Sequence, residues 1–352
     1  MTTRTLTIAC RILTTALFAT LGGIGAQAET RRPRHVTPEC EAAVKKGLSF
    51  LASKQGGNGS WRSEGHYGSY PVTMTSLASL GVLASGSTPT QGEHAPLLRK
   101  SLTYLVRSPQ SNGLICRRGD EESRSMYGHG FAMLFLAQVY GMEEDEERLN
   151  QIRWCLQKGV ALTERSQSRL GGWLYTPDMR GDEGSVTITQ VQALRAARNA
   201  GIAVPKKVID GAMDYLEKSF LPSGGIAYRV GMSDPRAPIT AAAVACWFNA
   251  GEYDNPMALK ALEYCKRNIG VGNTRQGVWG HYFYAHFYMA QVMYLAGDKE
   301  WDDYFPKIRD YLLNTQNEDG SWDGDSVGRV YGTAIALVIL QLPDGYLPIM
   351  QR

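Results

Sequence analysis

The apolar positions of this chain recur with the period of an α-helix, and two kinds of helix alternate along it. In the first kind, apolar residues form one stripe and charged residues lie outside it, as Val44, Leu48 and Leu51 do beside Lys45 and Lys46. Such a helix buries one face and leaves the other in water. Six outer helices of this kind are predicted, over residues 42–53, 97–107, 149–159, 206–218, 257–267 and 301–314.

The second kind of helix is apolar, small or aromatic around most of its circumference, which is typical of a buried helix. Six inner helices are predicted, over residues 74–85, 131–140, 186–198, 241–249, 282–295 and 330–340. No stretch shows a sustained period of two, so strands are not expected. The alternation predicts an all-α fold, an (α/α)6 toroid in which a closed ring of six inner helices is wrapped by six outer helices. We assign residues 41–352 to this domain.

The openings of the inner helices share a register. Thr73, Thr187 and Thr240 each follow a β-branched residue, and apolar side chains recur four and seven residues later on the same face. A second pattern relates two other inner helices, in which a Tyr-Gly pair precedes His129 and Thr333. These repeats indicate that the hairpins are copies of one structural unit.

Several hairpins also share a turn in which a tryptophan follows glycine. The tryptophans are Trp61, Trp173, Trp279 and Trp322. Glycine allows a positive φ where the outer helix ends. We expect each tryptophan to pack between neighbouring hairpins while its indole N–H donates to a carbonyl, which is a structural role.

The first 28 residues have the features of a signal peptide. Arg4 and Arg11 form a basic region, residues 12–26 are apolar but too short to span a bilayer, and a small-x-small cleavage site ends at Ala28. We therefore expect export to the periplasm or the medium, with a mature chain that begins near Glu29. An uncleaved membrane anchor is the alternative. Residues 29–40 are expected to form a flexible, basic N-terminus.

Charge and cysteine content narrow the possible partners. The formal net charge is only +3, and it falls further when Arg4 and Arg11 leave with the signal peptide. This excludes the strongly basic surface that is typical of nucleic-acid binding. Five scattered cysteines remain, which is not a disulfide framework, although one pair could form in an oxidising compartment. No later segment is predicted to span a membrane.

The segments Gln55–Trp61 and Gln316–Trp322 resemble the QW repeats of squalene-hopene and other triterpene cyclases. The surrounding hairpins resemble the prenyltransferase and squalene oxidase repeat family over nearly the whole mature chain. The resemblance implies an α/α toroid and an exported branch of this family. It does not identify a reaction, because protein prenyltransferases, thioester domains and lanthionine cyclases have the same toroidal fold.

The catalytic motifs of these relatives are incomplete here. Triterpene cyclases use an Asp-x-Asp-Asp motif, whereas this chain has only Asp182 and Glu183 at the corresponding place. Protein prenyltransferases hold zinc through an Asp-x-Cys pair and a histidine, and no Asp-x-Cys occurs in the sequence. We therefore predict neither a metal nor a cofactor.

Candidate site residues cluster where the inner helices begin, because their N-termini and the preceding turns meet at one end of the toroid axis. Helix dipoles there favour anions. The candidates for catalysis are His129, Asp182, His281, His286 and Asp325. The candidates for ligand binding are Tyr127, Thr187, Tyr284, Tyr288 and Tyr331. Only one stripe of the aromatic run 281–288 can face the axis. Alternatively, the histidines form hydrogen bonds between hairpins, and the aromatic run packs between neighbouring helices.

Two classes of function follow from these residues. The first is a binding or scaffold protein, with a lipid, a glycan or another protein as its partner. The second is an enzyme with histidine, tyrosine and carboxylate chemistry, either a terpenoid cyclase-like isomerase or transferase or a polysaccharide hydrolase or lyase. A carboxylate pair of Asp182 and Asp325 would require the third and sixth hairpins to face each other. Glu121 and Glu122 are expected to be solvated.

Overall fold

The computed structural model describes residues 32–66, 68–272 and 281–351 of the chain. Residues Met1–Arg32 form one unit and Pro33–Arg352 a second, and the architecture below is that of the second unit. The predicted signal peptide, residues 1–28, and Trp279 both lie outside the described residues.

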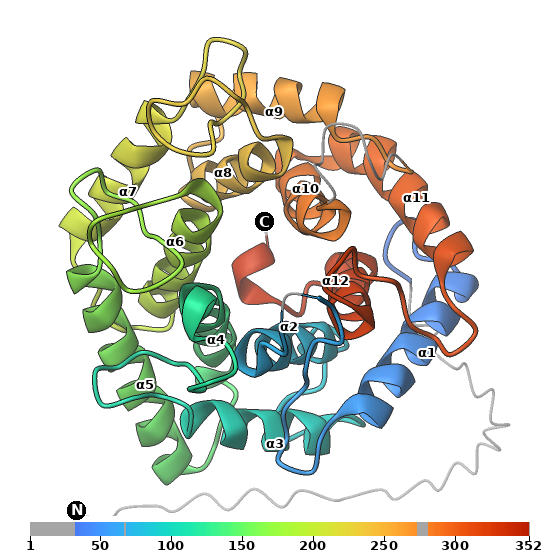
Figure 1. Ribbon diagram of the computed structural model, residues 1–352. Helices are drawn as coiled ribbons and strands as arrows, with labels where there is room; N and C mark the ends of the chain where they lie inside the picture. The colour runs from blue at the N-terminus through green and yellow to red at the C-terminus, as the bar shows by residue number, and fades with distance from the viewer. Residues whose placement is uncertain (1–31, 67, 273–280, 352) are drawn as a thin grey trace, which may run out of the picture. The chain divides into compact units, whose positions relative to one another are not determined.

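The described ranges form twelve α-helices in six hairpins, with an outer and an inner helix in each (Figure 1). The outer helices are α1 (Pro38–Lys54), α3 (Ala95–Val106), α5 (Glu146–Arg165), α7 (Lys206–Lys218), α9 (Pro256–Asn268) and α11 (Asp298–Thr315). The inner helices are α2 (Pro71–Leu83), α4 (Ser125–Tyr140), α6 (Gly184–Asn199), α8 (Ala237–Asn249), α10 (Tyr282–Ala296) and α12 (Arg329–Gln341). Short 3₁₀ turns are η1 (Glu122–Arg124), η2 (Leu342–Asp344) and η3 (Pro348–Met350).

The inner helices close into a ring. Each contacts the next, and α12 returns to contact α2 (Figure 1). Nearly every residue of these helices is buried, whereas the outer helices bury one face only. The predicted (α/α)6 toroid is therefore confirmed, because all-round apolar helices need neighbours on every side and a wrapped ring provides them.

Inner helix α4 begins at Ser125, earlier than predicted. The sequence predicted this helix from residue 131, but Gly128 and Gly130 both lie inside it. A Cβ on Gly130 would meet Thr189 of α6 at 2.6 Å, and one on Gly128 would meet Thr73 of α2 at 3.0 Å. These glycines therefore let α4 pack closely against both of its neighbours in the ring.

The tryptophan turns connect the two rings. In three of them the indole Nε1 donates to a carbonyl oxygen ten residues earlier, in the last turns of the outer helix. The pairs are Trp61 with Leu51 at 2.7 Å, Trp173 with Thr163 at 2.8 Å and Trp322 with Leu312 at 2.7 Å. All three tryptophans are fully buried. Each therefore contributes apolar area to the core without an unsatisfied donor.

A glutamine in each of these turns links consecutive outer helices. Its Nε2 donates to a carbonyl in its own turn and to a second carbonyl in the next outer helix. The glutamines are Gln55, Gln167 and Gln316, and the outer-helix acceptors are Leu97, Val208 and Ala43, each at 2.9 Å. The last of these bonds joins α11 to α1 and so closes the outer ring.

The segment before α1 is anchored where the structure describes it. Arg34 and His35 contact the carboxylate of Asp302 on α11, at 2.6 Å and 2.7 Å. The Arg309 guanidinium donates to the His35 carbonyl at 2.6 Å. Helix α1 then starts at Pro38, with Thr37 as its N-cap. The predicted flexible N-terminus therefore differs from the structure from Arg34 onward.

All five cysteines in the described ranges are buried and unpaired. No helix within those ranges is both long enough and apolar enough to cross a bilayer.

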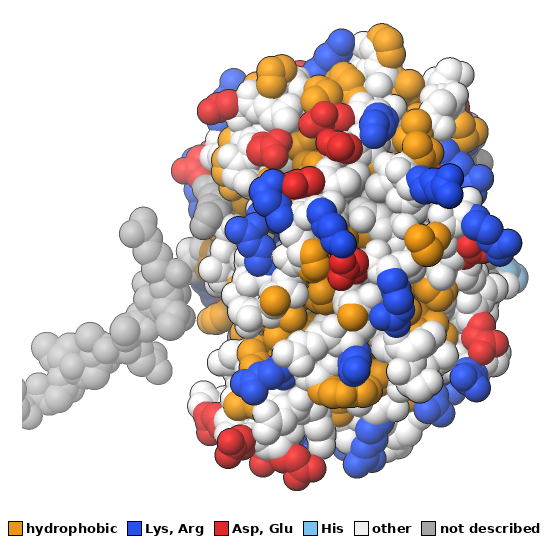
Figure 2. All heavy atoms as spheres, turned by 90° about the vertical axis from the view of Figure 1, so that its left-hand side faces the viewer, with side chains coloured by type: hydrophobic (Ala, Val, Ile, Leu, Met, Phe, Trp, Pro, Cys, Tyr) orange, Lys and Arg blue, Asp and Glu red, His pale blue; other side chains and the backbone are white. Residues whose placement is uncertain are grey.

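Figure 2 shows basic and acidic side chains interspersed on the face formed by the outer helices on the left of Figure 1, with single hydrophobic side chains between them. The outer surface on this side is therefore of mixed charge.

The closeness of the turn glycines to the next outer helix gives the first prediction. Gly171 has φ +97°, and a Cβ there would lie 1.9 Å from the Gly211 carbonyl oxygen. We expect Gly171→Ala to lower the free energy of unfolding by about 3 kcal/mol, through backbone strain and overpacking. Gly201 has φ +81° with no atom within 4 Å of a Cβ, so Gly201→Ala should cost about 1 kcal/mol. Urea denaturation measures both, and equal losses would contradict the packing argument.

Candidate functional site

Five of the inner helices in the described ranges accept a hydrogen bond from the preceding turn through a side chain in their first turns. The pairs are Trp61 N to Thr75 at 3.0 Å, Ile115 N to His129 at 3.2 Å, Trp173 N to Thr187 at 2.9 Å, Ile226 N to Thr240 at 2.9 Å and Trp322 N to Thr333 at 3.0 Å. His129 therefore occupies the place of a threonine, as its shared pattern with Thr333 indicates. In α2 the register differs by two residues from the predicted one, because Thr75 rather than Thr73 is equivalent to Thr187.

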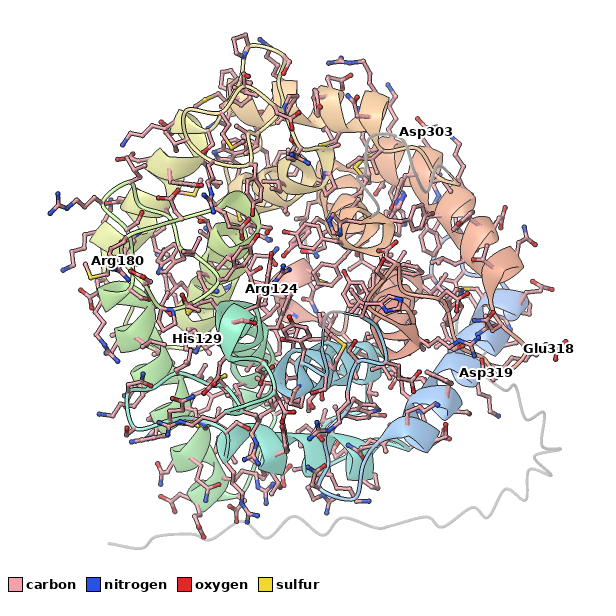
Figure 3. All side chains as sticks on the ribbon, viewed as in Figure 1. Arg124, His129, Arg180, Asp303, Glu318 and Asp319 are labelled. Carbon is pink, nitrogen blue, oxygen red and sulfur yellow. The ribbon has the colours of Figure 1, made fainter. Side chains whose placement is uncertain are left out.

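The two inner-helix histidines lie between the rings and not at the axis. Nε2 of His129 is 3.1 Å from the Thr163 hydroxyl of α5 (Figure 3), and burial lowers the pKa of His129 to about 4. Nδ1 of His286 is 2.8 Å from the Tyr304 hydroxyl of α11, and burial lowers its pKa to about 3. The structure thus gives both candidates hydrogen bonds to outer helices, because their face of the inner helix points outward.

Asp182 and Thr187 also lie away from the axis. The Asp182 carboxylate accepts from the Ser168 hydroxyl at 2.9 Å, within the turn of its own hairpin. The Thr187 hydroxyl donates to the Glu183 carbonyl at 2.7 Å while it accepts from the turn. Helices α6 and α12 do stand opposite each other (Figure 1), but Asp182 lies beside Tyr215 of outer helix α7. A carboxylate pair with Asp325 is therefore not formed.

Four tyrosines from three inner helices converge on the axis. They are Tyr127 of α4, Tyr284 and Tyr288 of α10, and Tyr331 of α12. Burial raises the pKa of Tyr284 well above its ordinary value, and the nearby Tyr288, Tyr127 and Glu183 raise it further. Tyr127, Tyr284 and Tyr331 nevertheless keep partial exposure. Together with Ser185 we call these residues the axial site.

The ring contacts of α10 show which of its two stripes faces the toroid axis. The rings of Tyr284 and Tyr288 lie 4.9 Å apart on the axial face, whereas Tyr282 and His286 face α11. The buried hydroxyls of Tyr284 and Tyr288 form no hydrogen bond of good geometry among the described residues, although Thr189 and Tyr284 lie close enough to lower the pKa of Tyr288. The site therefore presents two buried hydroxyls that are poorly satisfied within the described ranges.

A chain of hydroxyls links the axial site to a buried carboxyl group. The Tyr127 hydroxyl lies 2.6 Å from Oγ of Ser185, and Ser185 in turn donates to the Glu183 carboxylate at 2.8 Å. Glu183 is fully buried, which raises its pKa, although hydrogen bonds from Ser185 and Val186 oppose the shift. The arrangement can relay a proton between Glu183 and the axis.

Three buried carboxylates cap inner helices. Glu183 accepts from the N–H groups that open α6. Glu121 accepts from Val72 N of α2 at 3.2 Å, and burial raises its pKa to about 7. Asp325 accepts from Phe283 N of α10 at 3.0 Å, and desolvation raises its pKa to about 6. The expectation that Glu121 is solvated is thus wrong, because the N-terminus of the neighbouring helix binds it.

Two arginines and a histidine begin three of the inner helices. Arg124 and Arg236 are the N-cap residues of α4 and α8, and His281 is that of α10. Figure 3 shows Arg124 close to the centre of the ring. Desolvation and then the charges of Arg236 and Arg124 lower the pKa of His281, which favours its neutral form.

Below the tyrosines, side chains from opposite parts of the ring meet. The Phe131 ring of α4 lies 6.3 Å from the Phe287 ring of α10, and Gln192 of α6 donates to Gln291 of α10 at 3.1 Å. At the far end, the backbone of Ile349 donates to the Gln138 side chain of α4 at 3.1 Å. The C-terminal segment thus covers this end of the axis (Figure 1).

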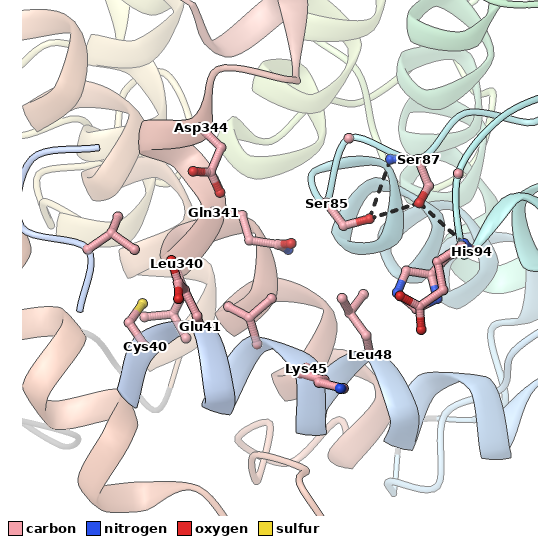
Figure 4. Close-up of a pocket in the computed structure, with 15 residues that line it drawn as sticks. Cys40, Glu41, Lys45, Leu48, Ser85, Ser87, His94, Leu340, Gln341 and Asp344 are labelled. Atoms are coloured by element: carbon pink, nitrogen blue, oxygen red, sulfur yellow. Dashed lines mark hydrogen bonds between the residues drawn. The ribbon is translucent and has the colours of Figure 1, made fainter. Parts of the chain in front are cut away.

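Two recesses lie away from the axial site. One, of about 490 Å³, is bounded by α1, the segment after α2 and the end of α12, and Figure 4 shows Cys40, Glu41 and Asp344 along it. The other, of about 390 Å³, lies along residues 107–118. No group of three potential metal ligands occurs in the part of the chain that the structure describes.

Sequence reasoning missed several residues of this region. Arg124, Ser185 and Arg236 were not candidates; Ser185 directly precedes the predicted inner helix 186–198, whereas Arg124 and Arg236 directly precede only the observed helices α4 and α8. The usable signal was position, because the residue before an inner helix lies near the axis whatever its chemistry. The search for histidines and complete acid motifs directed attention to residues that face outward instead.

The buried histidine gives a pH-dependent prediction. Unfolded His129 titrates near its ordinary pKa of 6.5, but the native side chain remains neutral down to about 4. Between these values the unfolded chain binds the extra proton, so stability is lost as the pH falls. We expect the stability advantage of the wild type over His129→Asn to shrink by about 3 kcal/mol between pH 7 and pH 4. The opposite effect of Glu121 is common to both proteins and cancels, and a difference that does not change with pH would contradict the assignment.

Comparison with known proteins agrees with this architecture. No protein family profile matches the chain. A squalene–hopene cyclase from Bradyrhizobium diazoefficiens is 24% identical over 197 residues, which are 48% of this chain and 29% of that protein. The chain thus spans less than a third of the length of this curated relative.

Solved structures align over most of the chain. The type II terpene cyclase MstE from Scytonema is 16% identical with a TM-score of 0.58, and the match covers 89% of this chain and all of that one. A glycosidase is 10% identical with a TM-score of 0.61, covering 88% of this chain and 97% of that one. At such identities the likeness concerns the fold. The fold of this chain is an α/α toroid similar to those of a type II terpene cyclase and a glycosidase.

Proposed function

We propose that this protein binds a lipid-like amphiphile in the axial site. The observation that carries the proposal is the meeting of four tyrosines from three inner helices, two of them with buried hydroxyls that form no hydrogen bond of good geometry among the described residues. Such a hydroxyl costs roughly 1–3 kcal/mol when it is unsatisfied, and a ligand oxygen would recover this energy. The tyrosine rings and Phe131 supply apolar contact around it.

A lipid fits the site better than a glycan does. The Scytonema cyclase has been solved with geranylgeranyl dihydroxybenzoate, an isoprenoid amphiphile, and this supports a similar ligand here. Glycosidases share the fold, but hydrolysis of a glycosidic bond needs two carboxyl groups that face the substrate. Glu121, Glu183 and Asp325 instead accept hydrogen bonds from helix N-termini.

We also propose that the chain is exported through the signal peptide over residues 1–28. The basic start, short apolar stretch and cleavage site support this interpretation. A protein that acts outside the cytoplasm would meet its amphiphile in a membrane or in the medium. The intact mass of the purified protein, with Glu29 as its first residue, checks the cleavage.

Extraction of the purified protein into organic solvent, followed by mass spectrometry, tests the binding proposal. We expect a bound amphiphile at near-stoichiometric amount in the wild type. The double variant Tyr284→Phe/Tyr288→Phe should lose about tenfold or more in occupancy, because two hydrogen bonds to the ligand are removed. The same variant should be at least as stable without ligand, because unsatisfied hydroxyls are gone.

Tyr104→Phe is the matched control. Tyr104 is buried on outer helix α3 and its hydroxyl also lacks a partner in the described ranges. Its replacement should leave occupancy unchanged. A protein free of any bound small molecule in wild type and variants alike would overturn the proposal.

A second candidate is an isomerase that transfers protons at the same site. The hydroxyl chain from Glu183 through Ser185 to Tyr127 favours it, because burial raises the pKa of Glu183 and lets the carboxyl hold a proton nearer to neutral pH. Protonation of a double bond and loss of another proton would convert an isoprenoid to an isomer of unchanged mass.

Incubation of the purified chain with farnesoic acid tests this candidate. We expect an isomer of the same mass, separable by chromatography, and at least about a hundredfold slower formation by Ser185→Ala, since general acid–base catalysis contributes about 10²–10⁴-fold. Ser168→Ala, which removes a hydroxyl bound to the outward-facing Asp182, is the control. Unchanged farnesoic acid after prolonged incubation leaves binding as the function.

A further inference from the structure

The turn between α3 and α4 departs from the repeat that closes the outer ring. Gly113 has φ +89°, and a Cβ on it would meet the Lys158 carbonyl oxygen at 2.5 Å. It corresponds to Gly59 and Gly171, which approach the next outer helix in the same way. Four residues before each of those two glycines stands a glutamine that bonds that helix. Four residues before Gly113 stands Pro109, which has no side-chain donor, so this turn lacks the glutamine bridge.

A recess of about 390 Å³ lies where the glutamine is missing, with Pro109 in its lining. Its volume falls within the range of small-molecule sites, about 300–1,000 Å³. Three of the side chains that line it are arginines, namely Arg107, Arg117 and Arg118. Serine and glutamine side chains of the turn supply further polar groups. We call this site the basic recess.

Backbone hydrogen bonds fix the walls of the basic recess. The N–H of Gln110 donates to the Leu114 carbonyl at 2.8 Å, and the N–H of Gly113 returns to the Gln110 carbonyl at 2.8 Å. The N–H of Cys116 donates to the Ser108 carbonyl at 3.4 Å. The two sides of the recess are therefore held together before any ligand binds, which lowers the cost of ordering them.

The guanidiniums of the basic recess have donors to spare. Those of Arg107 and Arg118 form no hydrogen bond or ion pair within the described ranges. That of Arg117 lies 6.0 Å from the centre of the Tyr104 ring, a contact that uses no N–H donor. All three arginines are exposed, so a ligand from solution can reach them.

The carboxylates near the recess only partly offset this charge. Burial and then the charges of three carboxylates raise the pKa of the Cys116 thiol to about 12. These carboxylates are Asp120, Glu121 and Glu122. The first pairs with Arg62 at 3.3 Å, and the second accepts from the Arg117 backbone N–H at 3.0 Å. The three arginines therefore outnumber the nearby carboxylates that lack such partners, and the recess attracts anions.

We propose that the basic recess binds a phosphoryl group, either as free phosphate or as the head group of a phospholipid. Guanidiniums match pairs of phosphate oxygens in a planar, two-bond geometry. A phosphoryl group has enough oxygens to accept from Arg107, Arg117 and Arg118 together, whereas a carboxylate has only two. The recess is separate from the axial site, and the proposal does not depend on the ligand bound there.

Calorimetric titration of the full chain with inorganic phosphate tests the proposal, at low ionic strength because salt screens exposed charges. We expect saturable binding, and binding of acetate about tenfold or more weaker. Arg107→Gln/Arg118→Gln should weaken phosphate binding about tenfold or more. Arg169→Gln/Arg267→Gln is the matched control, since it removes the same charge from exposed positions outside the recess. It should keep the wild-type affinity.

Sedimentation with phosphatidylcholine vesicles, with and without phosphatidic acid, distinguishes the two sources. Retention that requires phosphatidic acid and is lost in Arg107→Gln/Arg118→Gln identifies a lipid head group. Phosphate binding without retention identifies a soluble ligand. Binding of neither probe, equal affinity for phosphate and acetate, or equal losses in both double variants would overturn the proposal. The amphiphile content of the axial site should be the same in both variants, so a failure here leaves the proposed function intact.

Discussion

The close approach of each hairpin turn to the next outer helix is the constraint on which the toroid depends. Gly59, Gly171 and Gly320 all have positive φ, and a Cβ on any of them would meet a backbone carbonyl oxygen at 2.5 Å or less. This contact sets the distance between hairpins. The glutamine of the turn then bonds the next outer helix, and the tryptophan fills the space between the rings. Repetition of one contact thus closes both rings.

The same turn decides how the inner helices are used. Side chains on their outward faces accept hydrogen bonds from the backbone N–H groups of the turns, and these acceptors are the threonines and His129. The polar residues on that side therefore have a structural role. Only the inward faces remain for a ligand, and there the toroid places tyrosines and small polar residues. The division explains why buried histidines at helix starts are poor candidates for catalysis in this chain.

Electrostatics at the axis follows from the parallel arrangement of the inner helices. Their N-termini meet at one end, so partial positive charges accumulate there. Three buried carboxylates stabilise half of the helices, and desolvation raises their pKa values while the helix N–H groups oppose the shift.

The sequence by itself determined the fold, because the periodicity of its apolar residues and the repeated turns are local properties. It also named Tyr127, Tyr284, Tyr288 and Tyr331 as candidates for ligand binding, but it left open which stripe of the aromatic helix faces the axis. Tertiary structure alone decided which face of each helix points inward, and so removed Asp182, His129 and His286 from the axis. It also placed Arg124 and Arg236 where their charges lower the pKa of His281. Helical periodicity defines a stripe, but which neighbour that stripe meets depends on the rotation of the packed helix, and no local pattern specifies that.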